Sequence, residues 1–137
     1  MSPAQVRRVV WMLVVGVASG LALSGCTEPG TLDIFSEAQT EEDRLPESAI
    51  PSLVGAVDPD STRLLWTDDD VAYFAALSDD SGQCLVILED VDAWSGCSTR
   101  LPLQLASQGR PDMLLGDGLP DASEEWVKVA DHLWTRP

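Results

Sequence analysis

Apolar and polar positions divide the chain into three zones. An apolar run over residues 9–23 is followed by a polar stretch with prolines, and from residue 52 by short apolar runs separated by turn residues. Short apolar runs rich in β-branched and aromatic side chains, bounded by Asp, Ser and Gly, predict strands. The C-terminal zone is therefore expected to form a β-sheet.

The strands of this zone are expected to form an antiparallel meander. Residues 71–77 and 84–88 are apolar on both alternating faces, which indicates strands covered on both sides. Polar turns flank residues 71–77. For residues 126–134 a strand fits, with a short helix capped by Ser123 as the alternative. Residues 62–66 are expected to form the first strand of this meander, and residues 101–105 and 113–115 are two further expected strands.

Residues 31–43 are expected to form a short helix. Leu32, Phe35 and Ala38 recur at helical spacing, which predicts an apolar face docked on the rest of the domain. Prolines at 46 and 51 interrupt any continuation. The predicted fold class is α+β: a small, mainly antiparallel β-sheet domain with one disulfide and a short N-terminal helix. The predicted division is residues 1–25, 26–50 (tether and possible helix) and 51–137 (sheet domain).

The first 25 residues have the order of an export signal. Arg7 and Arg8 give a positive start, and the apolar run 9–23 is short for a spanning helix, which needs about 20 residues. The apolar run ends at Leu23, and Ser24, Gly25 and Cys26 come directly after it. These four residues resemble the lipobox of bacterial lipoproteins, in which Leu and two small residues precede an invariant Cys.

The lipobox resemblance implies a membrane anchor. Cys26 would receive a diacylglyceryl thioether through its thiolate, the bond before it would be cut, and the new amino terminus could be acylated. Two or more acyl chains attach stably, whereas one is marginal. The expected localisation is the extracytoplasmic face of the cell membrane. An ordinary secretory signal, or a buried helix ending in a chance Cys, is the alternative, and Sec and twin-arginine export both stay open.

The expected mature chain is strongly acidic. Removing residues 1–25 leaves 112 of 137 residues, and takes away two arginines but none of the 23 acidic residues, so the net charge changes from −15 to −17. Such a surface repels nucleic acid and anionic headgroups. Nucleic acid is therefore excluded as a partner, and a lipid is needed to bring the domain to a membrane.

The three cysteines also favour an extracytoplasmic location. If Cys26 carries lipid, Cys84 and Cys97 remain as one pair in an oxidising space, where a disulfide is expected. Their spacing is wider than that of a Cys-x-x-Cys redox pair, so the disulfide is interpreted as structural.

The mature part contains four short motifs: TEEDRLP (residues 40–46), DPDSTRLL (58–65), CLV (84–86) and GC (96–97). In these motifs it resembles small actinobacterial lipoproteins that have no assigned activity. The resemblance covers about two-thirds of the mature chain. It implies one disulfide-stapled, membrane-anchored domain and brings no catalytic residues.

The residues offer little catalytic chemistry. His132 is the single histidine, no Gly-x-Ser-x-Gly motif exists, and the default interpretation of His132 is a strand-end side chain. One histidine without free cysteines cannot build a usual zinc site. Paired carboxylates leave a small hydrolase open, although a domain of this size has little room for a glycosidase cleft. No catalytic residue and no cofactor are predicted.

Two weaker ligand sites are considered. Asp68, Asp69 and Asp70, with Asp58 and Asp60 upstream, offer the oxygen ligands that calcium prefers, but the EF-hand pattern is absent and a hydrated turn is favoured. Trp94 lies outside a strong apolar run. It is either an exposed ring that contacts a sugar or partner, or, as favoured, a side chain packed over the neighbouring disulfide.

The sequence therefore predicts a membrane-anchored, non-catalytic accessory or binding protein of the cell envelope. An envelope protein or a cell-wall glycan is the expected kind of partner, besides the membrane itself. A glycan- or calcium-binding module and a carboxylate-based hydrolase are the alternatives.

Overall fold

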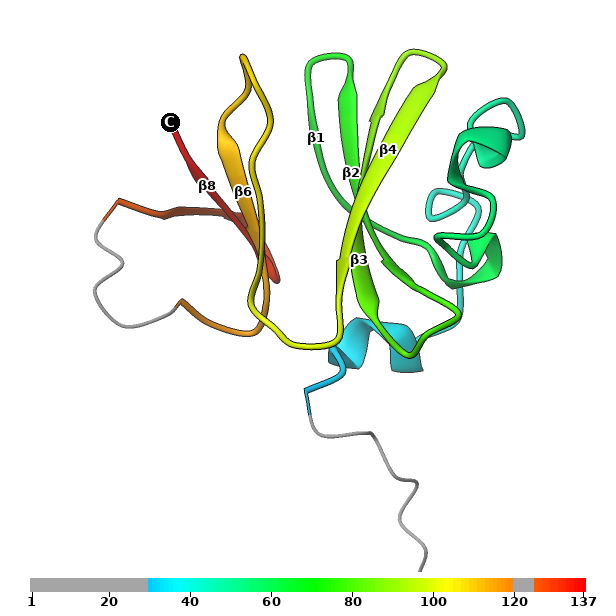
Figure 1. Ribbon diagram of the computed structural model, residues 1–137, viewed down its shortest axis with the longest axis horizontal. Helices are drawn as coiled ribbons and strands as arrows, with labels where there is room; N and C mark the ends of the chain where they lie inside the picture. Colours follow the sequence, from blue (N-terminus) through cyan, green and yellow to red (C-terminus); the bar gives the residue numbers. More distant parts are fainter. Residues whose placement is uncertain (1–29, 120–124) are drawn as a thin grey trace, which may run out of the picture.

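The computed structural model describes residues 30–119 and 125–137. Its strands form two four-stranded antiparallel sheets that lie face to face (Figure 1). Sheet A has the order β1-β2-β3-β4 and sheet B the order β5-β6-β8-β7. The strands are Arg63–Asp68 (β1), Val71–Leu77 (β2), Gln83–Glu89 (β3), Asp92–Ser98 (β4), Leu103–Leu105 (β5), Asp112–Leu115 (β6), Val127–Ala130 (β7) and Leu133–Arg136 (β8).

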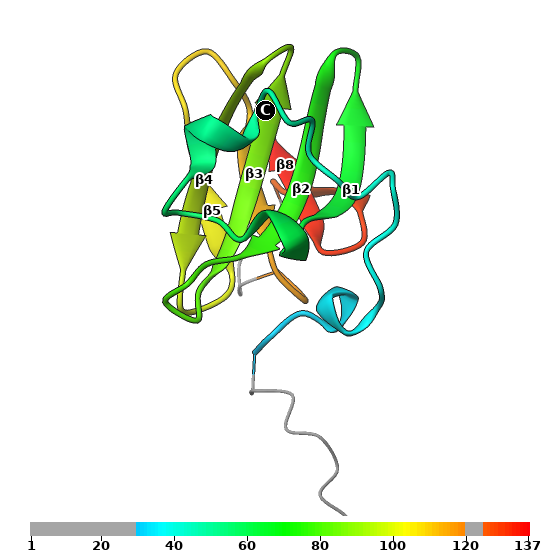
Figure 2. The same cartoon turned by 90° about the vertical axis from the view of Figure 1, so that its right-hand side faces the viewer.

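Sheet A is the middle layer of three. Its inner face packs on sheet B, and this inter-sheet core includes Tyr73, Leu85, Leu115 and Leu133. Its outer face is covered by the segment before β1, which contributes Leu45, Ala49, Leu53 and Val57 to a second core. Figure 2 shows this segment lying across sheet A. The central strands β2 and β3 are apolar on both alternating faces because both faces are buried.

The predicted meander is confirmed. Residues 71–77 form β2, the predicted strand 84–88 lies within β3, and every neighbour in sheet A pairs antiparallel. A bulge after Leu64 lets the next two side chains, Leu65 and Trp66, both pack on the inter-sheet core. The short turns use Asp69 and Asp90, which have positive φ angles of 50° and 55°. Aspartate tolerates this left-handed backbone better than most residues.

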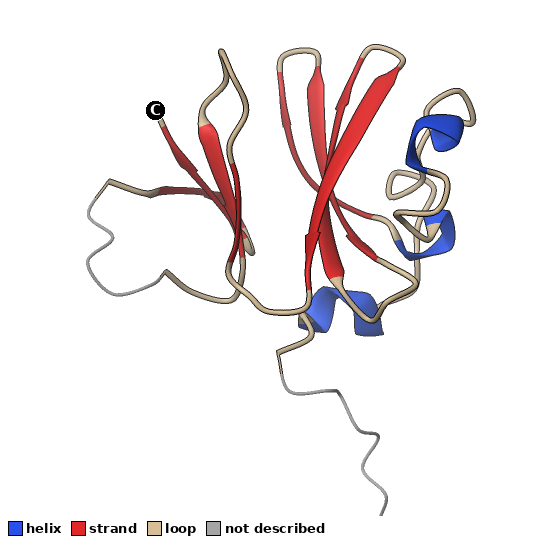
Figure 3. Ribbon diagram, in the orientation of Figure 1, coloured by secondary structure: helices blue, strands red, loops and turns tan. Residues whose placement is uncertain are grey.

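The helix predicted over residues 31–43 is wrong. Only one 3₁₀ turn forms there, Asp33–Ser36 (η1), and the chain is extended at Glu37. The buried Arg63 guanidinium holds the extended backbone by donating to the Glu37 carbonyl oxygen over 2.6 Å. The segment packs on the inter-sheet core through Leu32, and no helix continues after Ser36. Two further 3₁₀ turns, Ile50–Leu53 (η2) and Pro59–Ser61 (η3), are the other helical segments of the described residues (Figure 3). The α part of the predicted α+β class is therefore absent from these ranges.

The single strand predicted over residues 126–134 is also wrong. The chain forms a hairpin of β7 and β8 instead, and the turn between them places His132 at a φ of 65°. The period-two pattern continued through a two-residue turn, so the sequence alone did not separate the two strands. The predicted strand 101–105 is shorter and begins at Leu103, after Pro102.

The predicted disulfide is confirmed in position. Cys84 of β3 and Cys97 of β4 lie directly opposite each other in the register of the two strands and are joined. Cys84 is fully buried on the outer face of sheet A, whereas Cys97 is exposed. The bond therefore staples the edge strand β4 to the centre of the sheet.

Asp43 ties the covering segment to strand β1. Its carboxylate accepts the Leu64 backbone N–H over 2.9 Å and the Thr40 backbone N–H over 2.8 Å. Its carbonyl oxygen accepts the Thr62 hydroxyl over 2.6 Å. Two of the motifs noted above, residues 40–46 and 58–65, thus bind each other, which gives them a structural role.

These contacts set the pKa of Asp43. Burial raises the pKa of the carboxyl, but hydrogen bonds from Thr40 and Leu64, with the nearby Arg63 charge, outweigh burial and hold the pKa below the usual 3.8. A lowered folded-state pKa stabilises the fold above the unfolded-state pKa, and this contribution is lost as the pH falls through the folded value.

We predict that replacing both Cys84 and Cys97 by alanine lowers the free energy of unfolding by about 3 kcal/mol, because the open chain gains entropy when unfolded. Urea unfolding of the oxidised wild type and the double variant measures this. Wild-type protein treated with reductant should match the variant. Equal stability of the oxidised wild type and the variant would contradict the structural role.

We predict that Asp43→Asn lowers the free energy of unfolding by about 1–2 kcal/mol near neutral pH. The asparagine side chain is uncharged and has only one acceptor oxygen, so it cannot accept the N–H groups of both Thr40 and Leu64. The difference from wild type should shrink as the pH falls below about 3.8. Urea unfolding across this pH range measures it, with Asp80→Asn on the exposed β2–β3 turn as control. A pH-independent difference would count against the proposed cause.

Candidate functional site

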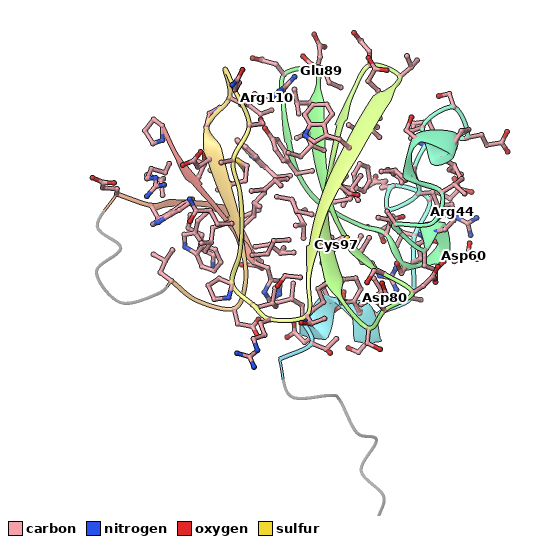
Figure 4. The ribbon with its side chains drawn as sticks, viewed as in Figure 1. Arg44, Asp60, Asp80, Glu89, Cys97 and Arg110 are labelled. Carbon is pink, nitrogen blue, oxygen red and sulfur yellow. A yellow bond between two sulfur atoms is a disulfide. The ribbon has the colours of Figure 1, made fainter. Side chains whose placement is uncertain are left out.

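The chain enters the domain at one end of the sandwich. Followed backwards from Gly30 toward residue 26, the chain leaves the domain here, so we call this the exit end. It consists of Gly30, the β2–β3 turn 78–82 and the β4–β5 connection 99–102. The distal end, opposite, carries the β1–β2 turn 69–70, the β3–β4 turn 90–91 and the β5–β6 loop 106–111. In Figure 4, Asp80 lies at the exit end, and Glu89 and Arg110 lie together at the distal end.

A buried amide fixes the chain at the exit end. The Gln83 side chain is 6% exposed; its Nε2 donates to the Gly30 carbonyl oxygen, and its Oε1 accepts the Leu32 N–H, both over 2.8 Å. Gln83 is the first residue of β3, a central strand. Both polar ends of one buried amide are therefore satisfied by the entering chain, which has a defined position against sheet A.

The same segment is attached to sheet B. The Leu32 side chain is 1% exposed and inserts into the inter-sheet core. Asp33, the next residue, contacts His132 of the β7–β8 turn, with 3.0 Å between Oδ1 and Nε2. The other ring nitrogen of His132, Nδ1, lies 3.0 Å from Asp117 Oδ1. We call Leu32, Asp33, Gln83 and His132 the exit lock, since together they join residues 30–33 to both sheets.

His132 is placed for binding carboxylates. Both ring nitrogens face carboxylate oxygens, so neither is left to accept a proton from a serine or threonine hydroxyl, as a nucleophilic triad requires. The expected strand-end position of His132 corresponds to the β7–β8 turn. The contact with Asp33 and Asp117 was missed, because the three residues are far apart in the sequence and no local pattern links them.

The acidic residues considered for calcium are separated. Asp68 ends β1 and leads, with Asp69 and Asp70, into the exposed turn at the distal end. Asp58 uses its carboxylate to accept the Asp60 N–H, and its own N–H donates to the Leu77 carbonyl at the other end of β2. Within residues 30–119 and 125–137, no group of three or more His, Cys, Asp or Glu side chains is arranged to hold a metal ion.

Trp94 occupies neither of its two predicted environments. It lies on the inner face of β4, packed against the inter-sheet core, whereas the disulfide lies on the outer face. The Arg110 guanidinium of the β5–β6 loop covers its ring at 4.6 Å from the centroid and also pairs with Glu89. Trp94 is thus half-buried, and a cation from the same chain occupies one face.

An aromatic row crosses sheet A beside this contact. Trp66, Tyr73, Ile87 and Trp94 are register neighbours on the four strands, and Trp66 stacks on Tyr73 with 5.2 Å between ring centroids. Burial raises the pKa of the Tyr73 hydroxyl; Asp68 adds to this and Arg110 opposes it. The row forms the distal part of the inter-sheet core, closed by Arg110.

The proposed lipidation site, Cys26 with Leu23, Ser24 and Gly25, lies outside the described residues. In the part of the chain that the structure describes, no helix is long and apolar enough to cross a bilayer. A comparison with protein-family models, curated proteins and solved structures found no match.

We predict that Gln83→Ala lowers the free energy of unfolding by about 1–3 kcal/mol, because it leaves the buried Leu32 N–H and Gly30 carbonyl without partners. It should also speed cleavage near residue 32 by a nonspecific protease. Urea unfolding and timed proteolysis measure both effects. Gln104→Ala, on an exposed position of β5, is the matched control. Identical cleavage of the Gln83→Ala variant and the control would refute the exit lock.

Proposed function

We propose that the protein is a lipoprotein held at the extracytoplasmic face of the cell membrane by lipid on Cys26. The observation that carries this proposal is the order of a positive start, an apolar run and Leu-Ser-Gly-Cys at 23–26. The disulfide supports it, since Cys84 and Cys97 are paired and Cys26 is the remaining cysteine. A disulfide also suits an oxidising compartment.

We further propose that the exported domain has a non-catalytic accessory or binding role in the cell envelope. The histidine has both nitrogens on carboxylates, and the two domain cysteines are joined, so neither a free histidine base nor a free cysteine nucleophile is offered within the described residues. The separated aspartates and the Arg110-covered Trp94 give no specific support to the calcium-binding, glycan-binding or hydrolase alternatives. An envelope protein therefore stays the proposed partner.

We predict that Cys26→Ser moves the exported protein from the detergent phase to the aqueous phase in detergent phase separation, because serine cannot accept the thioether lipid. Thr27→Ala, which keeps the thiol, is the control and should stay in the detergent phase. Intact mass of the wild type should exceed that of the residue 26–137 chain by the mass of at least two acyl chains. Detergent-phase recovery of the serine variant would overturn the proposal.

A further inference from the structure

A polar pocket opens at the exit end, beside the point where the chain enters. Its volume is about 260 Å³, and its lining includes Thr31, Ser81, Thr99 and Arg100. Three residues with hydroxyl groups and one arginine therefore line the same open pocket. The lining comes from three separate segments: the entering chain, the β2–β3 turn and the β4–β5 connection.

Arg100 is one of the few cations available to a ligand. Of the six basic residues after Cys26, Arg110, Lys128 and Arg136 pair with carboxylates and Arg63 is buried. Arg100 is exposed, and no carboxylate of the described residues lies within ion-pair distance of it. A guanidinium with hydroxyl donors is the donor set that binds phosphate oxygens, since Arg can bind them through two parallel N–H groups.

The pocket is close to the proposed lipid. Gly30 lines it and is fixed by Gln83. Cys26 lies four residues before Gly30, and covalent geometry limits that stretch to about 14 Å at about 3.6 Å per residue. Because the connection to a membrane-embedded lipid is short, neighbouring headgroups have a high effective concentration at the pocket. The pocket would therefore be occupied even if its affinity for a headgroup is weak.

We propose that the exit end rests on the bilayer surface and that the pocket at Arg100 binds the phosphate of a phospholipid headgroup. This inference rests on the proposed lipidation of Cys26. The distal end, with Glu89 and Arg110, then points away from the membrane (Figure 4). The anchor is required: Asp79 and Asp80 are exposed on the β2–β3 turn, and the acidic domain would not approach headgroups on its own.

The orientation is tested by photo-crosslinking of the intact lipidated protein. A benzophenone amino acid replaces Asp80 at the exit end or Asp92 at the distal end, two exposed aspartates whose replacement removes the same charge. The protein is reconstituted in phosphatidylcholine vesicles with a minority of phosphatidylglycerol. Lipid adducts are expected at position 80 and not at 92. Equal yields at both positions, or no adduct at either, would overturn the orientation.

The pocket is tested by introducing Arg100→Gln into the protein that carries the benzophenone amino acid at position 80. The adduct yield at position 80 should fall about tenfold, because the pocket loses its charged donor. Arg44→Gln, an exposed arginine on the covering segment, is the control and should leave the yield unchanged. An unchanged yield in Arg100→Gln would refute the headgroup contact, even if position 80 still crosslinks.

Two further measurements separate the possible causes of failure. Detergent phase separation of each sample reports whether the protein is lipidated. Recovery of the wild-type protein in the aqueous phase would overturn the proposed function. A lipidated protein that forms no lipid adducts would overturn only this inference. The Cys26→Ser chain is titrated with inorganic phosphate by NMR. No saturable shift at Arg100 is expected at millimolar phosphate; tight saturation there would instead assign the pocket to a free anion.

Discussion

The position of the chain at its point of entry depends on one buried amide. Gln83 is the first residue of a central strand, and its side chain can be buried only because its two polar ends are satisfied by Gly30 and Leu32. Burial of Leu32 between the sheets contributes about 2 kcal/mol and holds these partners in place. The entering segment is thus part of the domain, and the proposed anchor is connected to a fixed point.

The three layers explain how a small acidic domain stays folded. Sheet A buries both faces, one against sheet B and one against the covering segment, so that few strands supply two cores. Most charged side chains are exposed, whereas the buried Arg63 guanidinium donates to backbone carbonyl oxygens. The disulfide reinforces the pairing of β3 with β4, whereas Asp43 and the exit lock join segments that sheet hydrogen bonds do not connect.

The sequence predicted what depends on local patterns. Strands β2 and β3 were found because both of their faces are apolar, and the disulfide because only one cysteine pair remained. The helix over 31–43 failed because Leu32, Phe35 and Ala38 fit a helical face, while the backbone at Glu37 is determined by a distant contact with Arg63. The 126–134 hairpin was missed because its turn did not interrupt the alternation.

The candidate site was less predictable, because its parts come together only in the fold. Gln83 is an ordinary polar residue at a strand start, and nothing near it in the sequence indicates a bond to Gly30, which lies 53 positions away. His132 was identified as the single histidine, but its carboxylate neighbours come from two other segments. Arg100 had no motif around it and became a candidate only through the pocket beside it.

Amide hydrogen exchange at Leu32, followed by NMR on the lipidated protein in nanodiscs, reports whether the chain is fixed where it enters the domain. A chain fixed to the sandwich should protect this N–H as strongly as the amides in the middle of β3, since opening it requires breaking the bond to Gln83 and withdrawing Leu32 from the core. Exchange at the rate of an unstructured peptide would contradict a fixed point of entry, and with it the orientation inferred for the membrane.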